Sequence, residues 1–277
     1  MLAATGSTKI AGLVIASQRK PGDRTPNLVI STGGDTMASN AILAQQFKCK
    51  NVFVGSLRGV SSGLFSAVLH VNPALADQSQ HWIGLKPAPI DPDRPFSADG
   101  LPSRYAALLL GGPTKAEPFE GESLPIALRA MAAFAQTTDC NKLLVFTSRR
   151  TPRSWVAAAR KLEPTVILYT GEDTPFTFLR NALLGAEMVA VTADSSSMIT
   201  EAIYARRRTI ALTSAPFGRT DGDGAYLRML ESRNLLATIN TRDLGSKLLE
   251  QSLATVVPLD QNPLDLLAKA LVKLDVI

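Results

Sequence analysis

The chain has 277 residues, of which 45% are hydrophobic and 19% are charged, so a packed globular fold is expected and long disorder is not. Its 29 Lys and Arg residues and 24 Asp and Glu residues leave a formal net charge of +5. This modest excess suits anionic substrates or an anionic membrane surface, but no basic run is interleaved with aromatic residues, so nucleic-acid binding is not expected. Cys49 and Cys140 stand apart from any CxxC or Cys-His cluster and predict neither a disulfide framework nor a metal site.

The amino-terminal residues 1–23 lack the basic start and the continuous apolar run of a signal peptide. Their apolar stretch, residues 10–16, is too short to span a membrane. We therefore expect a cytoplasmic protein, with peripheral contact at the inner face of the membrane as an option.

The first hundred residues predict a domain with parallel strands. Apolar runs predict buried strands at 10–16, 28–32, 51–55, 67–71 and 81–85. The strand at 28–32 ends at Gly33-Gly34-Asp35, and a helix then runs to about residue 47. Residues 86–103 contain five prolines, which exclude helix interiors and central strands. We place a domain boundary there, giving domains of residues 1–100 and 101–277.

The second domain alternates strands and helices more strictly. Strands are predicted at 106–110, 143–147, 165–169, 188–192 and 209–213. Helices are predicted at 124–136, 152–162, 176–184, 225–234 and 263–274, with one more after the serine turn at 195–197; the last of them is free to return to the first domain. Such alternation predicts a parallel sheet covered on both faces, with ligands bound beyond the carboxyl ends of its strands.

Two of these strands end in loops that suit a phosphate ligand. After the strand at 106–110, Gly111 and Gly112 permit close backbone approach to a ligand, and Lys115 can reach a phosphate. A tight turn is the alternative. After the strand at 143–147, the loop that contains Ser148, Arg149 and Arg150 offers charge-assisted, bidentate bonds from its arginines to a diphosphate. A solvated basic loop is the alternative there.

The strand at 188–192 leads through Ser195, Ser196 and Ser197 into a helix. Helix N-termini present unpaired N–H groups and a positive dipole end, which suit a phosphate. Glu201, one turn further along, can accept hydrogen bonds from the vicinal hydroxyls of a ribose. The alternative is an ordinary serine cap followed by a solvated carboxylate.

The segments GGPTK, TSRRTP, GEDTPF and VTADSSSMITEA resemble a family of bacterial and plant proteins named for a mitochondrial fission factor, elongate mitochondria, which is itself similar to GT-B glycosyltransferases. The resemblance extends over residues 105–215. It implies an α/β, GT-B-like fold of two Rossmann-like domains whose parallel sheets face a central cleft, with the donor nucleotide in the second domain. It also implies that the loop before the helix at 176–184, with Phe176, contacts the base and that Glu201 holds the ribose.

Together these features predict a metal-independent glycosyltransferase that needs no cofactor. Its substrates would be a nucleotide sugar and a hydroxyl acceptor, such as a cell-envelope glycan or lipid. Arg149 would stabilise the diphosphate leaving group, and Asp35, beside the acceptor-side residues Gly33 and Gly34, would be the general base, with a helix cap as its alternative role. The competing hypothesis is a non-catalytic scaffold or nucleotide-binding interaction protein, because plant members of the family are fission factors that recruit a dynamin-related partner.

Overall fold

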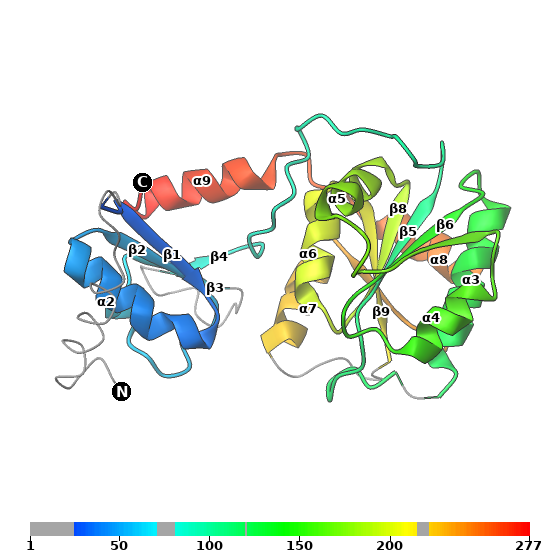
Figure 1. The fold of residues 1–277 in the computed structure, drawn as a ribbon, viewed down its shortest axis with the longest axis horizontal. Helices are drawn as coiled ribbons and strands as arrows, with labels where there is room; N and C mark the ends of the chain where they lie inside the picture. The colour runs from blue at the N-terminus through cyan, green and yellow to red at the C-terminus, as the bar shows by residue number, and fades with distance from the viewer. Residues whose placement is uncertain (1–24, 71–80, 120, 215–221) are drawn as a thin grey trace. The chain divides into compact units, whose positions relative to one another are not determined.

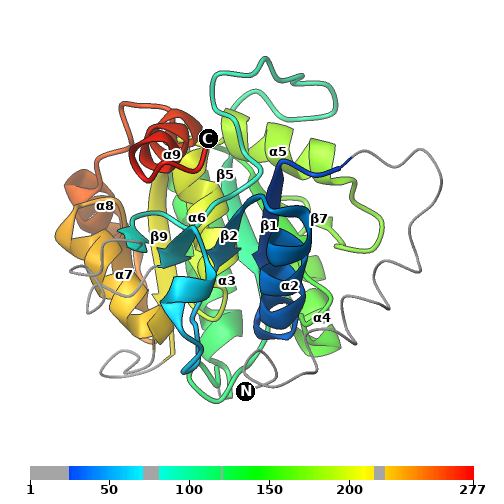
Figure 2. The same ribbon diagram turned by 90° about the vertical axis from the view of Figure 1, so that its left-hand side faces the viewer.

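The computed structural model describes residues 25–70, 81–119, 121–214 and 222–277. The chain forms two compact units, one of residues 1–86 with 264–277 and the other of residues 87–263 (Figures 1 and 2). The second unit begins at the start of the proline-rich segment in which the sequence places a boundary. The predicted strand at 10–16 lies outside the described residues.

The described part of the first unit contains a parallel sheet in the order β1-β2-β3-β4. Its strands coincide with four of the predicted strands to within two residues at each end: β1 (Leu28–Thr32), β2 (Lys50–Val54), β3 (Ala67–His70) and β4 (His81–Ile83). β1 is followed by a 3-10 turn, η2 (Gly34–Thr36), and then by the helix that the sequence predicts.

Both faces of this sheet are packed, because successive side chains of a strand point to opposite sides. On one face, Phe53 of β2 packs with Met37 of α2 (Met37–Phe47). Figure 2 shows α2 lying along β1 and β2, which it contacts. On the other face, Val52 belongs to a cluster with apolar side chains of α9 (Pro263–Lys273). The last helix of the chain therefore completes the core of the first unit.

The second unit contains a parallel sheet in the order β10-β9-β8-β5-β6-β7. Its strands are β5 (Ala106–Leu110), β6 (Leu143–Thr147), β7 (Val166–Tyr169), β8 (Met188–Thr192), β9 (Arg208–Thr213) and β10 (Ala237–Asn240). Every residue of β5 and β8 is buried, as expected for central parallel strands covered on both faces. The prediction of an α/β fold with parallel sheets is confirmed.

Helices cover both faces of the second sheet (Figure 1). One face packs against α3, α4 and α8, which share a single apolar cluster with the sheet. The opposite face carries α5, α6 and α7 (Figure 1). The bounds of the helices are α3 (Ser123–Thr137), α4 (Arg153–Arg160), α5 (Phe176–Gly185), α6 (Ser196–Tyr204), α7 (Gly222–Ser232) and α8 (Ser246–Thr255).

The sequence missed β10 and α8, which lie between the predicted helix at 225–234 and the terminal helix. β10 is a four-residue strand at the sheet edge, where it hydrogen-bonds to β9 alone. So short a segment has too few residues to show a hydrophobic period, and its strand state depends on pairing with β9.

The strand order creates a switch point at the centre of the second sheet. From β5 the chain passes outward through β6 and β7, and it then crosses back so that β8 lies on the other side of β5. This order is that of dinucleotide-binding α/β folds, in which ligands bind beyond the carboxyl ends of the strands where the direction reverses. The loops that follow β5 and β8 meet at this point.

Candidate functional site

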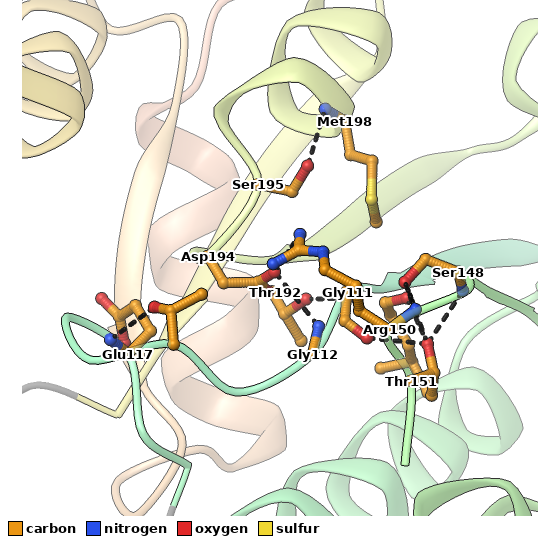
Figure 3. Close-up of polar contacts among 12 residues, drawn as sticks. Gly111, Gly112, Glu117, Ser148, Arg150, Thr151, Thr192, Asp194, Ser195 and Met198 are labelled. Atoms are coloured by element: carbon orange, nitrogen blue, oxygen red, sulfur yellow. Dashed lines mark hydrogen bonds and ion pairs between the residues drawn. The ribbon is translucent and has the colours of Figure 1, made fainter. Parts of the chain in front are cut away.

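The loops after β5 and β8 are joined by hydrogen bonds (Figure 3). The amide of Gly111 donates to the hydroxyl of Thr192, the last residue of β8, at 2.7 Å. The amide of Gly112 donates to Oδ2 of Asp194 at 3.1 Å. Both glycine amides are therefore held by side chains from the neighbouring strand end.

The loop after β6 is tied to the same place. The hydroxyl of Thr151 lies within donating distance of two carbonyl oxygens, that of Leu110 at 2.8 Å and that of Gly111 at 2.7 Å. The same hydroxyl accepts a hydrogen bond from the amide of Ser148 at 2.8 Å. The guanidinium of Arg150 donates to Oδ2 of Asp194 at 2.7 Å. Side chains after β6 and β8 thus hold the β5 loop from both sides.

The two glycines are required by the packing of the protein itself. A Cβ on Gly111 would lie 2.1 Å from Oδ2 of Asp194, and a Cβ on Gly112 would lie 2.3 Å from the carbonyl oxygen of Arg150. Neither glycine is among the residues with positive φ. Close approach of neighbouring loops, rather than a tight turn, explains why glycine occupies these positions.

Asp194 is the buried charge at this switch point. Its side chain has no solvent exposure, whereas the Arg150 side chain is 49% exposed. Oδ2 accepts two hydrogen bonds, but Oδ1 has no partner among the described residues. We did not predict Asp194 as a site residue, and of the two arginines that the sequence offers to a diphosphate, we assigned only Arg149 to the site. The available signal was an acidic residue two positions after a buried strand and one position before the predicted serine turn.

The three serines of the turn have different environments. Ser195 is the N-cap of α6, and its hydroxyl accepts from the amide of Met198 at 3.4 Å. Ser196 is buried and donates to Oδ1 of Asp223 at 2.8 Å. Ser197 is exposed. The structure therefore gives Ser195 the capping role that the sequence offered as the alternative reading, and leaves Ser197 exposed at the beginning of the helix.

Glu201 lies one turn into α6 and is partly buried. Burial raises the pKa of its carboxyl group from 4.5 to about 6, since desolvation disfavours the charged form. No hydrogen bond or ion pair to its carboxylate occurs among the described residues. A carboxylate so placed has its hydrogen-bonding capacity unused within the described chain.

The remaining predicted residues lie at loop and helix starts. Lys115 and Arg149 are exposed. Ser148 is partly buried, and its hydroxyl accepts from the amide of Arg150 at 3.2 Å. Phe176, the first residue of α5, is 44% exposed. In the second unit, then, the predicted residues do follow the carboxyl ends of β5, β6, β7 and β8.

The predicted acceptor-side residues belong to the first unit. Gly33 follows β1 with a φ of 87°, in the left-handed region that favours glycine. Gly34 and Asp35 form the first two positions of η2, and Asp35 is exposed. No side-chain hydrogen bond caps this turn. The structure thus gives no helix-capping role to Asp35.

Glu117 is a second buried carboxylate that we did not predict. It is 1% exposed and accepts from the Thr213 hydroxyl at 2.8 Å, from the Ser214 amide at 2.8 Å and from the Ser214 hydroxyl at 3.1 Å. These donors lie at the carboxyl end of β9. Glu117 therefore anchors the far part of the β5 loop to the end of another strand.

Two general properties of the described residues bear on the site. They contain no cluster of three or more His, Cys, Asp or Glu side chains arranged to hold a metal ion. None of the helices in the same part of the chain is both long and apolar enough to cross a lipid bilayer.

Solved structures with the same architecture define the class of the fold. A Listeria monocytogenes protein described as a candidate UDP-N-acetylglucosamine 2-epimerase gives a TM-score of 0.60 at 11% identity, covering 92% of this chain and 73% of that chain. An S. aureus MnaA-UDP co-structure gives 0.59 at 11% identity, covering 98% and 80%. The glycotransferase of kitacinnamycin gives 0.52 at 10% identity, covering 91% and 75%. The chain is thus a GT-B-like α/β protein, a fold shared by glycosyltransferases and epimerases.

The family follows from the sequence of the second unit. A family model described as Mitochondrial fission ELM1 matches residues 87–264, more than half of the chain. The chain belongs to this family, and the predicted resemblance is confirmed. Among curated proteins, none matches the sequence significantly.

Proposed function

We propose that the second unit binds a nucleotide sugar at the carboxyl edge of its sheet and that the protein transfers the sugar to a hydroxyl acceptor without a metal ion. The observation that carries this proposal is the meeting of the Gly111–Gly112 loop, the basic loop after β6 and the N-terminus of α6 at the switch point. The N–H groups at a helix N-terminus and guanidinium groups are protein groups that bind phosphates. The UDP of the MnaA co-structure, a protein of the same fold, is in keeping with this proposal.

Glu201 supports a nucleotide rather than a simple phosphate. It is partly buried on α6, one turn beyond the proposed phosphate site, with no partner among the described residues. A ribose hydroxyl pair would supply the missing donors, as it does to acidic residues in dinucleotide-binding folds. Phe176, exposed at the start of α5, is the proposed contact for the base.

The proposed chemistry follows from the charge that develops during transfer. Breaking the bond between sugar and nucleotide leaves a diphosphate, so fixed cations near that group stabilise the transition state more than the ground state. Lys115, Arg149 and the first turn of α6 are proposed for this role. Asp35 is proposed as the general base that takes the proton of the acceptor hydroxyl. A cell-envelope glycan or lipid is the proposed acceptor, and a cytoplasmic location at the inner membrane face is proposed with it.

One observation favours a second candidate function, a nucleotide-responsive binding module without transferase chemistry. The family match spans residues 87–264 and leaves Gly33, Gly34 and Asp35 outside it. The proposed donor site thus lies within the family-defining region, and the proposed base does not. A family described by mitochondrial fission is also compatible with a role in protein recruitment.

Calorimetry with a panel of nucleoside diphosphates and nucleotide sugars, with and without a chelator, tests the proposal. We expect one nucleotide to bind equally in both conditions. Glu201→Ala should weaken that binding about tenfold or more, since hydrogen bonds to charged groups contribute roughly 1.5–3 kcal/mol. Glu163→Ala is the matched control, because Glu163 is exposed and precedes β7 at the opposite edge of the sheet.

The outcomes separate the two candidate functions. If no nucleotide of the panel binds, both are refuted and the non-catalytic scaffold is favoured. If a nucleotide binds but its sugar is never consumed with any hydroxyl acceptor, the binding module replaces the transferase.

A further inference from the structure

The two adjacent arginines of the β6 loop differ in how the protein holds them. Arg150 donates to the buried carboxylate of Asp194 at 2.7 Å, and its guanidinium ends beside Asp194 and Ser195 (Figure 3). Arg149 is exposed, and no side-chain hydrogen bond holds it within the described chain. Of the two guanidinium groups, that of Arg150 is the one fixed beside the N-terminus of α6.

Arg150 keeps donors for a ligand while it stays paired. A guanidinium carries five N–H donors, and among the described residues only one bond, from Nη2 to Asp194, uses them. The Arg150 side chain is 49% exposed, so an anion in solvent can reach it. A phosphate can therefore bind Arg150 without displacing Asp194.

Asp194 cannot itself contact a ligand in this arrangement, because its side chain has no solvent exposure. It acts through the guanidinium of Arg150, which it holds by Oδ2; the amide of Gly112 donates its one N–H to the same oxygen and so ties the β5 loop to this pair. Because the Arg150 side chain is already held by Asp194, ligand binding loses less free energy to the ordering of that side chain. Both hydrogen bonds that Asp194 accepts within the described chain go to Oδ2, and the buried Oδ1 has no partner there.

We propose that Arg150 is the principal phosphate-binding cation of the site, ahead of Arg149, and that Asp194 is a positioning residue that holds Arg150 toward the ligand. This inference rests on the proposed function, since it assigns residues within the same nucleotide site. The proposal predicts the direction of the change in affinity: removing the Asp194 charge weakens phosphate binding, although a negative charge near an anion would ordinarily be unfavourable.

The test compares UDP and inorganic pyrophosphate by calorimetry with the full chain. We expect Arg150→Lys and Arg150→Ala to weaken both ligands, with a loss of tenfold or more for the alanine variant. Arg149→Ala should give a smaller loss. Arg160→Ala is the matched control, because Arg160 is exposed at the far end of α4 and should leave both affinities unchanged. A larger loss in Arg149→Ala than in Arg150→Ala would overturn the assignment.

A double-mutant cycle tests the role of Asp194. Asp194→Asn alone should weaken both ligands at least fivefold, but it should add no further loss in the Arg150→Ala background, because the two residues act as one unit. Additive losses would show a merely structural role, and tighter binding by Asp194→Asn would show that Asp194 competes with the ligand for Arg150. Either result overturns the positioning role. The double variant removes both charges of the ion pair, so no unpaired buried charge remains in it, and its affinity can be compared directly with that of the wild type.

Which of the two ligands binds the wild-type chain, and whether that binding depends on Arg150, distinguishes this inference from the proposed function. Pyrophosphate binding that depends on Arg150, with no nucleotide bound, would leave the inference standing and refute the nucleotide site. UDP binding that is unchanged in the Arg150 variants would refute this inference and leave the nucleotide site standing. If neither ligand binds the wild-type chain, both fail.

Discussion

Replacing Glu201 by glutamine should make the ligand-free protein more stable at neutral pH. The carboxyl group is partly buried, and burial raises its pKa from 4.5 to about 6. The unfolded chain ionises near pH 4.5 and the folded chain near pH 6, so the folded state is favoured by protonation. That contribution to the free energy of unfolding is fully present below pH 4.5 and is lost as the pH rises through about 6.

The size of the effect follows from the two pKa values. A difference between 4.5 and about 6 corresponds to about 2 kcal/mol, at about 1.36 kcal/mol for each pH unit. Glutamine has nearly the same shape and does not titrate. The free energy of unfolding of Glu201→Gln relative to wild type should therefore increase by about 1–2 kcal/mol between pH 4.5 and pH 8.

Urea unfolding at several pH values measures this difference. The sequence contains two tryptophans, and Trp155 is 5% exposed in the core of the second unit, so its fluorescence in a Trp82→Phe background reports on that unit. Glu163→Gln, at an exposed position, is the control and should show no such increase. A stability difference between Glu201→Gln and wild type that stays constant across pH, or that falls as the pH rises, would refute burial as the cause.

Three further substitutions test the hydrogen-bonded loops. Gly112→Ala should destabilise the second unit by about 3 kcal/mol in urea unfolding, because the new Cβ would lie 2.3 Å from the backbone oxygen of Arg150. Glu117→Ala should cost about 3 kcal/mol by the same measurement, since it removes the buried acceptor of the Thr213 hydroxyl and the Ser214 amide. Ser195→Ala should cost about 1 kcal/mol in thermal unfolding through loss of the α6 cap. Losses below about 0.5 kcal/mol, the usual range of surface substitutions, would contradict each account.

Much of the fold could be predicted from the amino-acid sequence. The predicted strands at 106–110, 143–147 and 188–192 coincide with β5, β6 and β8, because central parallel strands are apolar along their whole length. The weaker signals belong to edges. β10 is partly exposed along most of its length and short, so its identity as a strand depends on β9 beside it.

The candidate site was only partly predictable. The loops after the strands were identified, because polar and glycine-rich segments follow apolar runs at regular intervals. The Asp194–Arg150 and Glu117–Thr213 contacts were not, since their partners lie 44 and 96 residues apart in the chain. No local pattern of spacing relates residues that are so distant in sequence.

By itself, the sequence determined the alternation of strands and helices, and with it the parallel sheet and the edge at which the loops gather. Only the tertiary structure decided that β8 lies directly beside β5. Strand order depends on how all the helices pack over the sheet, whereas the period of apolar residues records only the local element. The switch point, and the buried carboxylate of Asp194 against Gly111, exist because of that adjacency.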